Sequence, residues 1–156
     1  MLREMEHAAA VEAELKRERI IGADVHWRGV GLLQLQVREI SAFGGGCVCD
    51  IRRVSGKSIA YMSLCNPERP GYLLPGYSEL GIDGDELEAF VKKIGQAMPK
   101  SLLPAGANIG LDGTNFMLRL INGFAEVNFS WWEDGPEEWK DLIALAREIV
   151  LRFRAA

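Results

Sequence analysis

The sequence predicts an α+β fold: an antiparallel sheet of four to six strands, two helices packed on one of its faces, and an additional N-terminal helix. Three observations support this. Apolar and polar residues alternate in several short runs, an Asn-Gly pair separates two such runs, and two stretches carry apolar residues at helical spacing. The 156 residues, 48% of them hydrophobic, suit one domain over 1–156 with its α+β core in 20–156.

The first expected element is a helix over residues 1–19, which are rich in Ala, Glu, Lys, Arg and Leu. Ala8, Val11 and Leu15 recur at helical spacing but form only a thin stripe. The segment is therefore either a helix attached at the edge of the domain or an extension that orders on a partner, including a second copy in a homodimer. Its short apolar stretch is flanked by glutamates, which is untypical of a signal peptide, so a cytoplasmic protein is expected.

Strands are expected from Gly31 onward. Leu33, Leu35 and Val37 alternate with polar side chains, which predicts a half-buried strand with one face toward water. The sequence then predicts a turn at Gly44-Gly45-Gly46, a strand over 47–53, a turn at Ser55-Gly56-Lys57 and a strand over 58–65. The exposed face of the sheet, a plausible surface for a partner, is expected to carry Gln34, Gln36, Arg38, Arg119, Glu126 and Asn128.

Three cysteines occur, and an odd number fits reduced thiols better than a disulfide framework. Cys47 and Cys49 lie two apart on an expected strand, so they share a face. With His26 they could ligate zinc, but the spacing is not that of usual zinc sites and no second pair follows. Buried structural thiols are the preferred interpretation. We expect no metal and no cofactor.

Residues 66–82 contain three prolines and three glycines and show no sustained period. A structureless segment of this length is often a binding loop, in which Tyr72 and Tyr77 would be the contact residues. The alternative is a connection that crosses the sheet and packs the two rings down.

An amphipathic helix is expected over residues 83–98, with Asp83 or Asp85 as its cap and Pro99 after its end. Five carboxylates lie between Glu79 and Glu88. They could form an acidic binding patch, but stabilisation of the positive end of the helix dipole explains them more simply.

The Asn122-Gly123 pair predicts a two-residue hairpin turn. That turn would place Leu120 opposite Ala125, Leu118 opposite Val127 and Phe116 opposite Phe129, with Arg119 opposite Glu126 on the other face.

Continued alternation places Trp131 on the apolar face and Trp132 on the wet face. Trp132, beside Glu133 and Asp134, could anchor a partner, or it could cover the sheet edge. A helix over 136–153 follows, with an apolar stripe wide enough to pack across a sheet.

These residues also carry a resemblance, which covers about the last third of the chain. The pattern consists of Leu111-Asp112-Gly113-Thr114, Leu118, Gly123, Trp131-Trp132, Pro136, Trp139 and Leu142. It resembles the ending shared by a loose group of small bacterial proteins, some of which are thought of as immunity-type proteins encoded near secreted toxins. The resemblance implies a hairpin followed by a packed helix and transfers no catalytic residue.

Sequence motifs for catalysis are lacking. His7 and His26 are the only histidines, and no nucleophile elbow, metalloprotease motif, dinucleotide fingerprint or calcium loop occurs. A carboxylate pair from distant segments, such as Asp50 with Glu126, could still form a glycosidase-like site. The expectation is nevertheless that the protein is not an enzyme.

Net charge and hydropathy limit the classes of partner that we expect. The net charge of −4 argues against nucleic-acid binding, and no run of about 18 apolar residues predicts a membrane span. We expect a protein-binding module, most concretely an immunity-type inhibitor that occludes a toxin's active site. Its partner-binding residues would be Tyr72, Tyr77, Trp132, Glu133 and Asp134. The alternative is a small-molecule-binding protein or enzyme with a pocket between sheet and helices.

Overall fold

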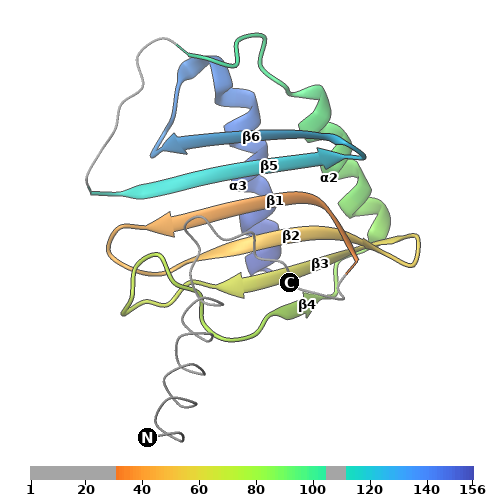
Figure 1. Ribbon diagram of the computed structural model, residues 1–156, viewed down its shortest axis with the longest axis horizontal. Coiled ribbons are helices and arrows are strands. Elements are labelled where there is room, and N and C mark those ends of the chain that lie inside the picture. The colour runs from red at the N-terminus through yellow and green to blue at the C-terminus, as the bar shows by residue number, and fades with distance from the viewer. Residues whose placement is uncertain (1–30, 105–111) are drawn as a thin grey trace, which may run out of the picture.

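The computed structural model describes residues 31–104 and 112–156 (Figure 1). The expected N-terminal helix over 1–19, both histidines and Leu111 lie outside the described residues. The strands are β1 (Leu32–Ser41), β2 (Gly46–Val54), β3 (Lys57–Leu64), β4 (Ser78–Leu80), β5 (Thr114–Asn122) and β6 (Ala125–Trp132). The helices are α2 (Gly84–Gln96), the short 3-10 helix η1 (Glu137–Trp139) and α3 (Lys140–Arg154).

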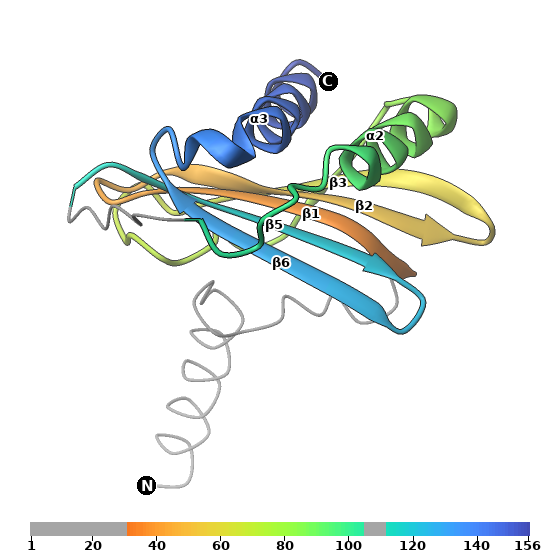
Figure 2. The same cartoon turned by 90° about the horizontal axis from the view of Figure 1, so that it is seen from above.

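The described part of the chain forms one six-stranded antiparallel sheet in the order β4-β3-β2-β1-β5-β6. Both α2 and α3 lie on one face of this sheet (Figure 2), as the apolar stripes of the two helices predict. The α+β prediction is therefore confirmed for the sheet and its two helices. None of the described helices is long and apolar enough to cross a membrane.

The core lies between the sheet and these helices. It combines every second residue of the central strands with the inner faces of α2 and α3, and includes Leu35, Val37, Ile51, Leu87, Ile94, Leu118, Leu142, Ile149 and Phe153. Two aromatic pairs lie on the β6 side of this core: Phe116 stacks on Trp131, and Phe129 meets Trp139 edge to face. Trp131 thus lies on the apolar face, as predicted.

Helix α2 begins where the sequence predicts. The carboxylate of Asp83 accepts a hydrogen bond from the backbone N–H of Asp85 at 2.8 Å, which makes Asp83 the cap. Glu86 then pairs with Arg152 of α3 at 2.6 Å, and Glu88 pairs with Arg53 of β2 at 3.2 Å. The acidic start of the helix is thus engaged in capping and in ion pairs within the fold.

Strand β1 contains an irregularity that alternation did not reveal. The register with β2 shifts between Leu33 and Leu35, so Gln34 is an extra residue, a β-bulge. The Gln34 side chain accepts a hydrogen bond from Ser58 Oγ at 3.0 Å, and that hydroxyl also lies 3.5 Å from Glu88 of α2. The prediction that Gln34 lines the same face as Gln36 is therefore wrong, because the bulge turns it toward the helix side.

The hairpin forms, but its register is shifted. Asn122 pairs with Ala125, so the two turn residues are Gly123 and Phe124. Gly123 has a φ of +59°, which suits the first central position of a type II′ turn. The predicted cross-strand partners on β6, Ala125, Val127 and Phe129, each lie two residues before the observed partner. The reason is that the turn begins one residue later than predicted. An even shift keeps every side chain on its predicted face.

The connection of residues 65–77 is ordered by backbone pairing. Cys65 pairs with Leu73, and Leu74 N–H donates to the carbonyl oxygen of Leu64 at 2.8 Å. Its apolar residues reach the face of the sheet away from the helices, where Cys65 and Leu73 form a small second core with Val48 and Ile40. Figure 2 shows this connection beneath the sheet. The segment 66–82 is thus partly structured, and it also contains strand β4, which alternation did not reveal.

Candidate functional site

Four segments that are distant in the sequence meet at one end of the sheet, which we call the loop end. They are the β1–β2 turn 41–46, the connection 65–77, the entry to β5 at 112–114 and the exit from β6 at 132–135. Backbone hydrogen bonds join neighbouring segments: Ala42 N–H donates to Gly113 at 2.8 Å, and Cys65 N–H donates to Gly46 at 2.9 Å. The four segments form the left end of the sheet in Figure 1.

Tyr72 and Tyr77 lie in one of these segments. Tyr72 is half-buried, with the Arg69 guanidinium 4.2 Å from its ring centre, and its carbonyl accepts from Asn66 N–H. Tyr77 keeps 49% of its surface exposed while it meets Tyr61 edge to face at 5.4 Å. The connection therefore has features of both alternatives: the Tyr77 ring packs on Tyr61 of β3 and still reaches the surface, whereas the Tyr72 ring lies against Arg69 of the connection itself.

Trp132, Glu133 and Asp134 lie in another of these segments and are engaged in the turn out of β6. Glu133 adopts a φ of +48°, and its carboxylate accepts from Thr114 N–H at 2.5 Å. Arg147 of α3 donates to the Glu133 carbonyl at 3.0 Å and to the Asp134 carboxylate at 3.1 Å. The half-buried Trp132 lies over Gly113, where an added Cβ would come 2.8 Å from the ring. These residues shape the turn, and each of the two carboxylates already has a partner inside the fold.

The structure brings the two predicted groups to the same end of the sheet and places the β1–β2 turn between them. Phe43 in that turn has 75% of its surface exposed, and sequence reasoning overlooked it. The signal was an aromatic residue directly before the triple glycine. All three glycines have positive φ, and a Cβ on Gly44 or Gly46 would come 2.0 Å from a backbone oxygen of Pro67 or Glu39, respectively. The tight glycine turn therefore fixes the position from which Phe43 projects.

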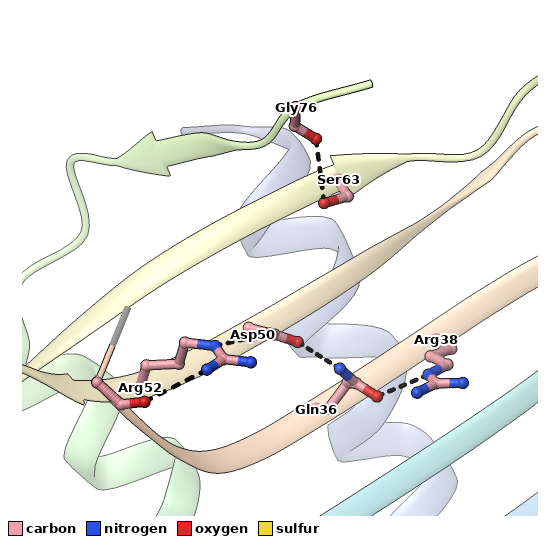
Figure 3. Close-up of polar contacts among 7 residues, drawn as sticks. Gln36, Arg38, Asp50, Arg52, Ser63 and Gly76 are labelled. Atoms are coloured by element: carbon pink, nitrogen blue, oxygen red, sulfur yellow. Dashed lines mark hydrogen bonds and ion pairs between the residues drawn. The ribbon is translucent and has the colours of Figure 1, made fainter. Parts of the chain in front are cut away.

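A second polar cluster lies at the centre of the sheet face away from the helices (Figure 3). Gln36 donates to Asp50 at 2.8 Å, and Arg38 Nε donates to the other end of the same amide at 2.6 Å. Arg52 Nε donates to the second Asp50 oxygen at 2.9 Å. We call this set, Arg38, Gln36, Asp50 and Arg52, the polar row.

The polar row is buried, with 2% of Gln36 and none of Asp50 exposed. The prediction that Gln36 and Arg38 form part of a wet face is therefore wrong, since alternation reports which face a residue is on and not whether that face meets water. Burial raises the pKa of the Asp50 carboxyl, and the hydrogen bond from Gln36 and the charge of Arg52 oppose this rise. The row is a continuous set of hydrogen bonds between buried side chains, and Arg52 extends it to the carbonyl of Gly31 at 3.5 Å.

The carboxylate pair of Asp50 and Glu126 is not formed. Asp50 lies on β2 and Glu126 on β6, with β1 and β5 between them. Three strand spacings amount to about 14 Å, more than the 5 to 10 Å that separate paired glycosidase carboxylates. Glu126 instead accepts from Arg119 at 2.8 and 2.9 Å, so the predicted contact between these two is confirmed, although diagonally across the hairpin.

The cysteines are free and buried, as the sequence predicts. Cys47 and Cys49 share the helix side of β2, with their Sγ atoms 3.8 Å apart, whereas Cys65 belongs to the second core. Burial raises the pKa of the Cys65 thiol to about 12. No group of three or more His, Cys, Asp or Glu side chains within 31–104 and 112–156 is placed to hold a metal ion.

We compared the chain with protein-family models, with curated proteins and with solved structures, and none of these comparisons found a match.

Proposed function

We propose that this protein is a non-enzymatic protein-binding module and that its loop end contacts the partner. The observation that carries the proposal is the exposed Phe43 ring on a glycine turn of fixed geometry. Aromatic side chains on a rigid base lose little conformational entropy when a partner covers them, which makes them suitable anchors.

The surroundings of Phe43 support the same use. Leu64 at the end of β3 and Leu74 and Tyr77 in the neighbouring connection are also exposed, so several segments present apolar groups at this end. Glu68 and Asp112 add exposed carboxylates beside them. An apolar centre with a charged rim is the usual composition of a protein interface.

The most specific form of the proposal is a cytoplasmic immunity-type inhibitor that occludes the active site of a bacterial toxin. It is supported by the resemblance of the C-terminal third to small proteins of that type. The net charge of −4 is compatible with attraction to a basic toxin. The anchor role of Phe43 does not depend on this specific partner.

The test compares two exposed phenylalanines at opposite ends of the sheet. Phe43 lies at the loop end, and the fully exposed Phe124 lies in the β5–β6 turn at the other end. A partner is captured with the wild-type protein from its source cells, purified and titrated against Phe43→Ser and Phe124→Ser. We expect Phe43→Ser to weaken binding about tenfold or more and Phe124→Ser to leave it within about twofold.

Equal affinities of the two variants would contradict the role of the loop end. Failure to capture any protein would contradict the binding-module proposal as a whole. For the immunity-type form, the captured protein is produced in cells with and without this chain. Growth inhibition that this chain does not relieve would contradict that specific form and leave the binding module intact.

A further inference from the structure

The Asn122-Gly123 pair combines a reactive side chain with an accessible backbone nitrogen. It is the one Asn-Gly pair in the sequence, and both of its residues are exposed. Asn122 is the last residue of β5, and Gly123 is the first turn residue, with a φ of +59°. The side chain of Asn122 makes no hydrogen bond with the described residues. Its amide is therefore available to react with the backbone that follows it.

Gly123 carries the attacking nitrogen with little obstruction. A Cβ added to this residue would meet no heavy atom within 4 Å, so the space around it is open. The residues that flank a two-residue hairpin turn, here Asn122 and Ala125, exchange the last hydrogen bonds of the ladder. The N–H of Gly123 lies outside that ladder, and glycine has no side chain to shield it. The nitrogen can therefore approach the side-chain amide carbon of the residue before it.

We propose that Asn122 is a site of spontaneous deamidation through a cyclic imide. The backbone nitrogen of Gly123 loses its proton to hydroxide and attacks the side-chain amide carbon of Asn122, so a new C–N bond forms. The bond from that carbon to the side-chain nitrogen breaks, and this nitrogen leaves as ammonia. Water then opens the ring at either carbonyl, which yields aspartate or isoaspartate. The net reaction consumes one water molecule and replaces a neutral amide by a carboxylate and an ammonium ion.

The end of the hairpin controls the rate of this reaction. Asn122 is held in an extended conformation by its pairing with Ala125, and ring closure requires the backbone between Asn122 and Gly123 to rotate. The reaction therefore proceeds when this last pair separates. Exposed ends of a sheet open locally at a lower free-energy cost than its interior, so the pair beside the turn is the one that opens most often.

Three further asparagines within 31–104 and 112–156 lack these conditions. Asn66 precedes Pro67, whose nitrogen has no proton to lose. Asn115 and Asn128 lie within β5 and β6, and each precedes a buried phenylalanine. Asn128 also donates to the Glu126 carboxylate at 2.8 Å. The structure thus distinguishes the Asn-Gly pair from asparagines on the same two strands, which serve as internal controls.

The isoaspartate product changes the hairpin. It continues the main chain through the former side chain, which adds one carbon atom to the backbone directly before the turn. Because a two-residue turn fixes the register of its strands, the added atom should loosen the pairing of β5 with β6 at this end. Phe43 lies at the opposite end of the sheet, so binding of a partner at the loop end should be retained.

The experiment ages the folded full chain at mildly alkaline pH and follows it by peptide mapping. We expect Asn122 to convert into a mixture of aspartate and isoaspartate at least about tenfold faster than Asn115 or Asn128. The rate should rise with pH, because the attacking nitrogen must first lose its proton. Methyl transfer from S-adenosylmethionine by an isoaspartyl methyltransferase measures the isoaspartate independently.

Asn122→Gln is the matched variant, since it keeps the amide but requires a larger ring, and it should stay unmodified over the same period. An Asn122 that remains intact in the wild-type chain, or converts no faster than Asn115 and Asn128, would overturn the proposal. So would conversion to aspartate without isoaspartate, because direct hydrolysis of the side chain yields aspartate alone. These outcomes are read from the wild-type protein and do not depend on folding of the variant.

Unfolding the chain in urea tests the role of the hairpin end. The pairing with Ala125 no longer restrains Asn122 in the unfolded chain, so conversion should be faster there than in the folded protein. Equal rates in the two states would overturn control by the hairpin end and leave the site of deamidation in place.

Discussion

The two faces of the sheet hold their side chains in different ways. On the helix face, Leu118 and its neighbours are buried against α2 and α3 in one continuous apolar cluster. On the opposite face, Asp50 and Gln36 are equally buried, but each of their polar atoms engages a specific partner. The same alternating strands thus produce one face that is stabilised by buried apolar area and another that is stabilised by hydrogen bonds between buried polar side chains.

This difference determines how each face should respond to substitution. Loss of apolar atoms costs transfer free energy and leaves a cavity, and the cost scales with the volume removed. Loss of one polar partner costs more than the bond itself, since the remaining group stays buried without compensation. Substitutions on the two faces should therefore follow these separate rules.

The largest effect is expected on the helix face. Leu118→Ala removes a fully buried side chain from the centre of the core and should lower the free energy of unfolding by about 3 to 5 kcal/mol. Met117 is its neighbour on the same strand, points to the opposite face and is only half-buried. Urea denaturation of both variants should show that Met117→Ala lowers the free energy of unfolding by less than half as much. Equal losses would contradict the contrast between the faces.

The next effect is expected in the polar row. Gln36→Leu keeps the side-chain size but removes the donor to Asp50 and the acceptor of Arg38, so a loss of about 2 kcal/mol is expected. Gln34→Leu is the matched control on the same strand, because Gln34 is half-buried and has one hydrogen bond, from Ser58. The control should lose about 1 kcal/mol or less. A Gln36 variant at least as stable as wild type would show that the row is stabilised by packing alone.

Gln34 and Gln36 also mark the limit of sequence reasoning. Period, caps and turn residues were sufficient to predict the central strands, both helices and the glycine turn, because these signals are local. The bulge that separates the two glutamines depends on pairing with β2, and the burial of the polar row depends on what lies over the face. The alternation of apolar and polar residues in β1 alone therefore predicts neither the bulge nor the burial.

The candidate site was predictable to a similar extent. The composition of residues 66–82 suggested Tyr77, and the alternation that ends beside Glu133 suggested Trp132; the antiparallel strand order brings their segments to one end of the sheet. Phe43 was overlooked, because its exposure follows from a turn whose geometry is set by contact of Gly44 with Pro67, a residue of another segment.

The pH dependence of stability tests the polar row in another way. The folded pKa of Asp50 is raised by burial, so the folded protein binds this proton more tightly than the unfolded chain does. The contribution of Asp50 to stability is therefore largest below the unfolded value of about 3.9 and falls as the pH rises toward the folded pKa, by at most about 1.4 kcal/mol per pH unit. Asp50→Asn should remove this slope, as measured by thermal or urea unfolding across acidic pH. An unchanged slope would assign it to other groups.

The smallest effect is expected at the rim of the same face. Glu126→Gln weakens the ion pair with Arg119, whose partners are partly exposed, so the loss should stay below about 1 kcal/mol. Added salt screens such a pair, and the difference from wild type should shrink between low and high ionic strength. Because solvent replaces the lost contact at the rim but not at the centre, Glu126→Gln should cost clearly less than Gln36→Leu. A salt-independent loss as large as that of Gln36→Leu would mean that rim and centre form one buried network, and the distinction between paired and solvated groups on this face would be wrong.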